Sequence, residues 1–410
     1  MHPESLMMSY GYNSESFERA VKCPIFQTST FTFKTAEEGK AFFEIAYGLR
    51  EKLSNENLGY IYSRIDNPNL KILEKRLSLW DKTEDCAVFE SGMAAISTVL
   101  LEFLNPGDLL VYSNPVYGGT DHFINTFLPK MGIHTLGVHP DESKEKIIEL
   151  INASGKADKL ALIYLETPAN PTNEIVDIET YSSIATHFSS NEKKVLCTVD
   201  NTYMGPLWQH PLQFGADLII YSATKYIGGH SDLIAGAVLG NSDLMIRIKT
   251  LRTFLGNMLN PNTAWLLMRS LETLKVRMDQ QTKNAQQVAQ FLKEHSAIEK
   301  VNYLGLLDKN TEAYKIYKKQ CTAPGAMISF DIKGSEKEAF KFLNKLKLIK
   351  LAVSLGGTES LAEHPITMTH AGVDAEHRKK MGITDTLIRL SIGVENPIDI
   401  INDLKQALQD

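Results

Sequence analysis

The sequence has little cysteine and no long hydrophobic run. Its four cysteines among 410 residues are widely spaced, without a Cys-x-x-Cys pair: Cys23, Cys86, Cys197 and Cys321. A disulfide framework and a zinc site are therefore poorly supported, and no metal ligands are predicted. No stretch approaches the ~18 apolar residues that span a bilayer, and the first residues lack the pattern of a secretory signal. We therefore expect a cytoplasmic protein with no membrane partner.

Positive charge is not in excess either. Lys plus Arg total 43 and Asp plus Glu total 49, so the net charge is −6. Such a chain has no overall attraction to nucleic acid. No G-x-G-x-x-G string occurs, which argues against a nicotinamide-dependent enzyme on a Rossmann sheet. Hydrophobic residues at 43% and charged residues at 22% are typical of a globular protein, and this length favours two or three domains.

Three regions differ in their hydrophobic pattern. Residues 1–65 are polar and weakly periodic, which indicates an N-terminal arm that contacts a partner subunit. Residues 66–262 alternate short apolar runs with helical patterns, and this alternation predicts a large α/β domain with a mostly parallel sheet. Residues 263–410 begin with a long helical stretch over 263–294 that links to a smaller C-terminal α+β domain.

The individual elements are predicted from periodicity and from runs of apolar residues. Strands are expected at 86–89, 109–112, 160–165, 195–199, 218–221, 327–331 and 388–391. Helices are expected at 68–80, 92–104, 336–346 and 397–408.

Chemically distinctive residues follow four of the predicted strands. Ser91-Gly92-Met93 opens a helix, Asn170 lies in the loop after 160–165, Asp200 follows 195–199, and Ser222 to Lys225 follow 218–221. Ligands of open parallel sheets bind at the carboxyl ends of the strands. Each residue alone has an ordinary explanation, such as a turn, a helix cap or a solvated surface charge. Together, an amine, a carboxylate and a helix N-terminus match the needs of pyridoxal phosphate.

The chemistry of each group supports this interpretation. A buried Asp200 would keep the pyridine nitrogen protonated, which makes the ring an electron sink. A desolvated Lys225 would have a lowered pKa and become a usable base and nucleophile. The hydroxyls of Ser222 and Thr224 and the helix N–H groups could bind the phosphate.

Further motifs recur in a fixed order between about residues 60 and 395. They include Tyr62-Ser63-Arg64, Ser91-Gly92-Met93, Val116 to Thr120, Val199 to Thr202, Ser222 to Tyr226, Ser354 to Gly357 and Ile388 to Gly393. In this order they resemble the Cys/Met-metabolism family of enzymes that use pyridoxal phosphate. The resemblance implies the fold type I architecture of aspartate-aminotransferase-like enzymes, with a large, mostly parallel sheet of seven strands and a smaller C-terminal domain.

The resemblance also implies roles for individual residues. Lys225 would carry the cofactor covalently and move protons, and Asp200 would pair with the pyridine nitrogen. Tyr117 would stack on the ring and act as an acid toward the leaving sulfur. The residues implied to bind the phosphate are Gly92, Met93, Ser222 and Thr224.

The remaining implied residues concern the substrate and the neighbouring subunit. Ser354 and Arg389 would hold the substrate carboxylate, with Asn170 near the ring oxygen and the substrate. A buried arginine needs an anion partner, which this carboxylate would supply. Tyr62 and Arg64 would bind the phosphate of the neighbouring subunit's cofactor, so the resemblance implies a dimer of dimers with shared active sites.

The reaction expected from the resemblance is γ-elimination on a sulfur amino acid of the methionine, cystathionine or homocysteine type. It gives 2-oxobutanoate, ammonia and a thiol. The alternative is γ-replacement, as in cystathionine γ-synthase or O-acetylhomoserine sulfhydrylase, because the same residues serve both reactions. A cofactor-binding protein without turnover is a third hypothesis, but it would not need Tyr117 or Arg389.

Three sequence features indicate different substrates. Methionine γ-lyases usually carry Cys where this chain has Gly119, whereas enzymes that favour cystathionine often carry Glu where it has Val353. Ser231 resembles the cystathionine enzymes, since methionine γ-lyases more often have Gly there. Residues 42–57 form a longer segment than is usual in the family.

Overall fold

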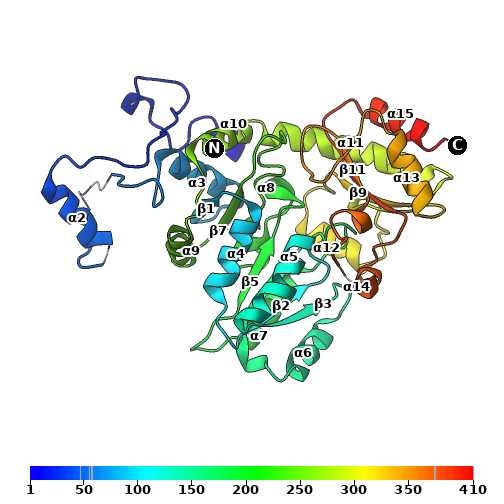
Figure 1. The fold of residues 1–410 in the computed structure, drawn as a ribbon, viewed down its shortest axis with the longest axis horizontal. Coiled ribbons are helices and arrows are strands. Elements are labelled where there is room, and N and C mark those ends of the chain that lie inside the picture. Colours follow the sequence, from blue (N-terminus) through cyan, green and yellow to red (C-terminus); the bar gives the residue numbers. More distant parts are fainter. Residues whose placement is uncertain (47, 55, 57–58, 374, 410) are drawn as a thin grey trace.

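A large sheet of seven strands forms the centre of the molecule (Figure 1). We analyse it in a computed structural model that describes residues 1–46, 48–54, 56, 59–373 and 375–409. Strands β2 to β6 run parallel, and β7 pairs antiparallel with both β6 and β1. The strands, in spatial order, are β1 (Asp85–Phe89), β7 (Gly236–Gly240), β6 (Leu218–Tyr221), β5 (Leu196–Asp200), β4 (Leu160–Glu166), β2 (Leu109–Ser113) and β3 (His134–Val138).

Helices cover both faces of this sheet because its strands alternate their side chains between two apolar cores. On β4, Leu162 and Tyr164 enter the core shared with α4 (Gly92–Phe103). Ile163 and Leu165 enter the opposite core. That second core includes side chains of α6 (Lys144–Ala153) and α7 (Ile178–Phe188), and α3 (Pro68–Asp81) packs beside β1. The expected fold class is therefore confirmed.

A second sheet of five strands follows in the C-terminal part. Its strands, in spatial order, are β10 (Lys350–Leu351), β11 (Leu361–Glu363), β12 (Leu387–Ser391), β9 (Met327–Ile332) and β8 (Ile298–Asn302). Helices α13 (Glu336–Lys345) and α15 (Pro397–Ala407) pack against one another beside it. Asp403 of α15 accepts hydrogen bonds from the backbone N–H groups of Lys347, Leu348 and Ile349, at 2.9 Å in the shortest contact of each.

The prediction of a single helical stretch over 263–294 is wrong. It consists of two helices, α10 (Pro261–Leu271) and α11 (Leu274–Glu294), which are separated at Thr273. Thr273 has ψ of 5° instead of a helical value. Helix α11 continues from the large sheet toward the five-stranded sheet (Figure 1).

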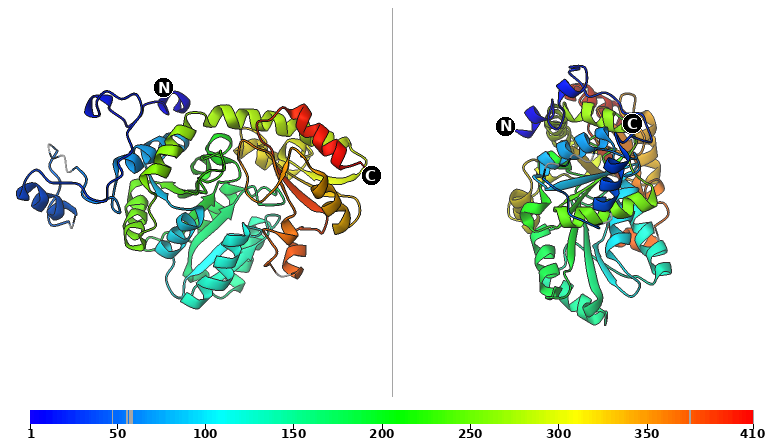
Figure 2. Two further views of the ribbon diagram at one scale, coloured as in Figure 1. Left: turned by 45° about the horizontal axis from the view of Figure 1, so that its top comes forward. Right: turned by 90° about the vertical axis from the view of Figure 1, so that its left-hand side faces the viewer.

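The N-terminal segment that contains α2 (Ala36–Ala46) extends away from the rest of the molecule (Figures 1 and 2). Helix α1 (Pro3–Leu6) packs against α3 instead, and Thr30 forms an isolated bridge with Tyr62. Part of segment 42–57, which the sequence predicts to be longer than usual, lies outside the described residues, at positions 47, 55 and 57. In the part of the chain that the structure describes, none of the helices is both long and apolar enough to cross a bilayer.

Candidate active site

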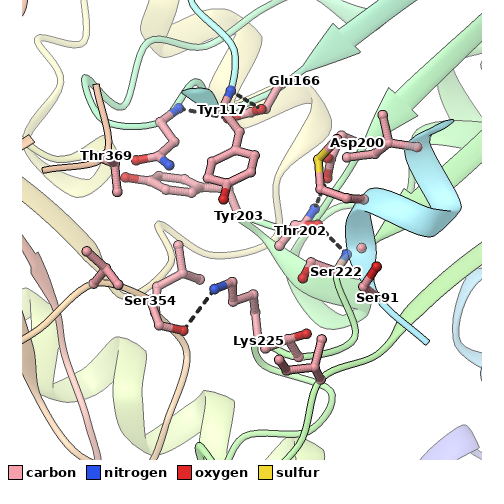
Figure 3. A pocket seen from close by; sticks show the side chains of 18 of the residues that line it. Ser91, Tyr117, Glu166, Asp200, Thr202, Tyr203, Ser222, Lys225, Ser354 and Thr369 are labelled. Carbon is pink, nitrogen blue, oxygen red and sulfur yellow. Dashed lines mark hydrogen bonds between the residues drawn. The ribbon is translucent and has the colours of Figure 1, made fainter. Parts of the chain in front are cut away.

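A cavity of about 310 Å³ opens at the carboxyl ends of β4, β5 and β6 (Figure 3). Side chains from the five-stranded part, including Ser354 and Arg389, close its other side. The structure thus brings ten residues predicted from the sequence to one cavity. They are Gly92, Met93, Tyr117, Asn170, Asp200, Ser222, Thr224, Lys225, Ser354 and Arg389.

Lys225 points its amine into this cavity (Figure 3). Its Nζ donates a hydrogen bond to Ser354 Oγ at 2.8 Å. Burial lowers the pKa of Lys225 to about 8, and the positive charge of Arg389 contributes in the same direction. Ser354 has a φ of +89°, a strained conformation for a residue with a side chain. The lowered pKa of Lys225 gives it a much larger neutral fraction near physiological pH than an ordinary lysine has, and the neutral amine is the form that acts as nucleophile and base.

Asp200 ends β5 and is only 4% exposed. Its carboxylate accepts hydrogen bonds from the Tyr164 hydroxyl at 3.1 Å and from the backbone N–H of Thr202 at 3.0 Å. Burial raises the pKa of Asp200, and these hydrogen bonds oppose the rise. A cationic ring nitrogen placed beside it would further favour the ionised form.

The N-terminus of α4 forms a cradle against Ser222. Ser91 caps the helix by accepting a hydrogen bond from the N–H of Ala94 at 3.0 Å. The N–H groups of Gly92 and Met93 belong to the first turn, where no carbonyl of the helix can accept them. A Cβ on Gly92 would lie 2.7 Å from Ser222 Cβ, so only glycine leaves this space open. An anion such as phosphate fits this arrangement.

The hydroxyl of Thr224, predicted to bind the phosphate, already forms hydrogen bonds within the chain. Its hydroxyl donates to the carbonyl of Ala235 at 3.1 Å and accepts from the N–H of the same residue at 3.0 Å. Donating to a phosphate would require the first of these bonds to break. Its predicted role stays a prediction.

Arg389 of β12 forms a buried ion pair with Glu363, which is its register partner on β11. The Nη1–Oε1 distance is 2.9 Å, and the residues are 3% and 0% exposed. The guanidinium also donates to Asn170 Oδ1 at 2.9 Å and to the Ser354 carbonyl at 2.6 Å. The anion partner that a buried arginine needs is thus present within the chain, and the sequence argument did not name it.

Tyr117 precedes α5 (Gly118–His122) and is 41% exposed. Its backbone N–H donates to Glu166 Oε2 at 2.7 Å (Figure 3). A Cβ on Gly119 would lie 2.7 Å from Cε1 of the Tyr117 ring. Glycine at this position therefore makes room for the ring, and a larger residue, such as the cysteine considered above, would require the ring to move.

Tyr62 and Arg64 lie on the N-terminal region and do not line this cavity of their own chain. Tyr62 is 40% exposed. Arg64 Nη1 donates to the carbonyl of Thr253 at 2.7 Å. Their predicted role toward a neighbouring subunit stays a prediction.

Sequence reasoning missed Tyr164, Glu166 and Glu363. Tyr164 and Glu166 belong to β4, whose end forms the same edge of the sheet as Asp200, so their position near a strand end was the available signal. Glu363 has no such local signal, because it is recognised only through its pairing with Arg389 across two strands.

These residues fit pyridoxal phosphate: a lysine amine with a lowered pKa, a buried carboxylate, and a glycine-lined cradle at a helix N-terminus face one cavity. They define a site of the class found in enzymes that use this cofactor.

Comparison with known proteins supports this class of site. The chain matches the family described as Cys/Met metabolism PLP-dependent enzyme over residues 4–409. It is 42% identical to L-methionine gamma-lyase of Fusobacterium nucleatum, covering 94% of this chain and 93% of that protein. It is 41% identical to human cystathionine gamma-lyase, covering 86% and 84%. The structure of cystathionine gamma synthase from Xanthomonas oryzae pv. oryzae in complex with aminoacrylate and cysteine is similar, with a TM-score of 0.87, 32% identity and coverage of 100% and 98%.

The chain therefore belongs to the Cys/Met-metabolism family of PLP-dependent enzymes. Pyridoxal phosphate is its cofactor, as the sequence predicted.

The cradle can be tested with Gly92→Ala. The added methyl group would collide with Ser222 and push the helix end away from the phosphate. We expect the dissociation constant of the cofactor to rise about tenfold or more, which equals ~1.4 kcal/mol. Equilibrium dialysis or fluorescence titration measures it. Gly372→Ala is the matched control, because a Cβ there meets nothing within 4 Å; equal affinity in both variants would contradict the cradle.

The lowered pKa of Lys225 predicts how cofactor uptake depends on pH. Only the neutral amine attacks the aldehyde, so the rate of covalent uptake by the apoprotein should rise with pH and level off above a midpoint near 8. An ordinary lysine would give a midpoint near ~10.4. Stopped-flow absorbance of the yellow product, with Nα-acetyl-lysine as the reference amine, measures the midpoint. A protein midpoint at that of the reference would contradict the prediction.

Proposed function

We propose that the protein catalyses PLP-dependent γ-elimination on a sulfur amino acid, giving 2-oxobutanoate, ammonia and a thiol. It is then a carbon–sulfur lyase. The observation that carries this proposal is the Lys225 amine, whose pKa is lowered to about 8 and which shares a cavity with Asp200 and Arg389. The lyases among its relatives, at 37–42% identity, support the same reaction.

When bound, pyridoxal phosphate supplies an electron sink that stabilises negative charge at the substrate's α-carbon. The chain's residues supply proton transfer and orientation. Lys225 Nζ takes the α-proton, and Ser354 Oγ holds this amine in place when it is not engaged. Asp200, whose carboxylate accepts hydrogen bonds from Tyr164 and Thr202, would hold the proton at the ring nitrogen. The Tyr117 hydroxyl donates a proton to the leaving sulfur.

The cavity walls favour a substrate whose side chain ends without charge. Val353, Leu355, Ile234 and Ile96 are apolar wall residues. Among the described residues that line the cavity, the acidic ones are Glu166 and Asp200, and donors already hold both carboxylates. A distal ammonium group, such as that of cystathionine, would therefore find no free carboxylate on these walls. Methionine and homocysteine fit this condition.

The second candidate is γ-replacement, in which an incoming thiol attacks the activated substrate. The similarity to a cystathionine gamma synthase structure, with a TM-score of 0.87, favours it. The same proton transfers by Lys225 serve both reactions, so only the products distinguish them.

We also propose an assembly and a location. Residues 1–65 would form an arm on a partner subunit, beside units at 66–262 and 263–410. Tyr62 and Arg64 would then bind the phosphate of the partner's cofactor, and two such dimers would form a tetramer. The exposure of Tyr62 supports this arrangement.

The proposed location is the cytoplasm. The four cysteines are all free and buried, which is typical of proteins in a reducing cytoplasm.

A substrate panel tests the reaction. We expect 2-oxobutanoate from methionine or homocysteine without added thiol, and less from cystathionine, because the walls leave a second ammonium unpaired. Coupled reduction of the oxoacid measures the product, and Lys225→Ala is the inactive control. Product that forms only when an activated homoserine and a thiol are supplied together would establish γ-replacement instead.

A shared site predicts complementation between two inactive subunits. In a hybrid of Arg64→Ala and Lys225→Ala chains, one site would combine the intact Lys225 of the first chain with the intact Arg64 of the second. Random pairing should restore up to about a quarter of wild-type activity. Activity and cofactor content after co-refolding measure this recovery. No recovery in verified hybrids would show that Arg64 serves its own chain or neither site.

A further inference from the structure

Glu166 is the last residue of β4 and lines the cavity, although it is only 4% exposed. Its two carboxylate oxygens accept from two different backbone N–H groups. Oε2 accepts from Tyr117 at 2.7 Å, and Oε1 accepts from Asn170 at 3.1 Å. Figure 3 shows the bond to Tyr117. One side chain therefore joins two residues that flank the cavity.

These two residues belong to different loops. Tyr117 follows β2, and Asn170 follows β4 itself. The backbone N–H of Glu166 also donates to Ser113 Oγ, at 3.0 Å, so β2 and β4 are linked at their ends as well. Without a common acceptor, each loop could move relative to the other. The carboxylate of Glu166 fixes both to the same strand end.

A carboxyl group has two acceptor oxygens and can accept both bonds. A glutamine of the same shape has one acceptor oxygen and one donor NH₂ group, so one of the two N–H groups would face another donor. The carboxylate is costly at this position: burial raises the pKa of Glu166 to about 8, and its register neighbour Asp200 adds to the rise. The two N–H groups and Arg389 act in the opposite direction.

One edge of the Tyr117 ring packs against its own loop. The space that a Cβ of Gly119 would fill is occupied by the ring edge, and Met93 Sδ lies 3.4 Å from the same point. A shift of the Tyr117 backbone would therefore change this contact and move the ring. The bond from Glu166 thus acts on the face that the ring presents to the cavity.

We propose that Glu166 is a positioning residue that holds Tyr117 and Asn170 in register on either side of the cofactor. This role rests on the proposed function, because it assigns Tyr117 and Asn170 to the cofactor ring. Glu166 would act through these two residues and not on the substrate.

The test compares Glu166→Gln with Asp403→Asn in the holoenzyme. Asp403 is the matched control because it is also a buried carboxylate that accepts backbone N–H groups, but it lies in the C-terminal part, away from the cavity. We measure the visible circular dichroism of the bound cofactor, its dissociation constant, the thermal unfolding of each apoprotein, and kcat and KM.

For Glu166→Gln we expect a weaker visible dichroism, a dissociation constant about tenfold higher, and a fall in kcat that exceeds any change in KM. For Asp403→Asn we expect a lower unfolding temperature with wild-type dichroism and affinity. Wild-type dichroism and affinity in Glu166→Gln, with only its stability reduced, would overturn the proposal.

Glu166→Asp keeps the charge and both oxygens but withdraws them by one methylene, so it serves if Glu166→Gln does not fold. Its dichroism should be reduced, and an unchanged signal would overturn the proposal. The dichroism and the affinity do not depend on turnover. If the wild-type protein released no oxoacid from any substrate, the proposed reaction would fail while these two measurements still decided the role of Glu166.

Discussion

The site depends on holding two carboxyl groups side by side in a buried place. The parallel register of β4 and β5 puts Glu166 beside Asp200, and burial raises the pKa of both. Two buried like charges repel strongly in a medium of low dielectric constant. Each is therefore stabilised by its own donors: a tyrosine hydroxyl and a backbone N–H for Asp200, and two backbone N–H groups for Glu166. The loops that supply these donors must take the conformations that the carboxylates require.

The parallel strands could be predicted from the sequence because strands buried on both faces are apolar throughout. Strand β4 is an example, since all seven of its residues are buried. Strand β3 lies at the edge and carries exposed residues such as His134, so it gave no such run. Strand β7 contains Gly236 and Gly240, and glycine is uncommon in strands, so the sequence did not indicate a strand there. Both positions require glycine because a Cβ would lie too close to neighbouring atoms. The break between α10 and α11 lies at Thr273, where the backbone leaves the helical conformation, and hydrophobic periodicity does not report such a local change.

The position of a residue relative to an apolar strand also explains which site residues could be predicted from the sequence. Asp200 and Lys225 follow apolar strands directly, so their place at the sheet edge was visible. Glu166 also lies at a strand end, but its role depends on the N–H of Tyr117, 49 positions earlier. Backbone donors have no signature in a sequence. Glu363 is more hidden still, because its partner Arg389 is brought to it by an antiparallel pairing of two short strands.

The Glu363–Arg389 pair changes how substrate recognition must be understood. An arginine without an internal anion would bind a carboxylate strongly, since the ligand would relieve a buried charge. Here Glu363 already provides that charge, and Asn170 and the Ser354 carbonyl occupy further donors of the guanidinium. A substrate carboxylate would therefore join or rearrange an existing network. Because Ser354 also holds Lys225, such a rearrangement would reach the catalytic amine through a single residue. If the substrate carboxylate binds there, its binding and the release of the amine would be physically coupled.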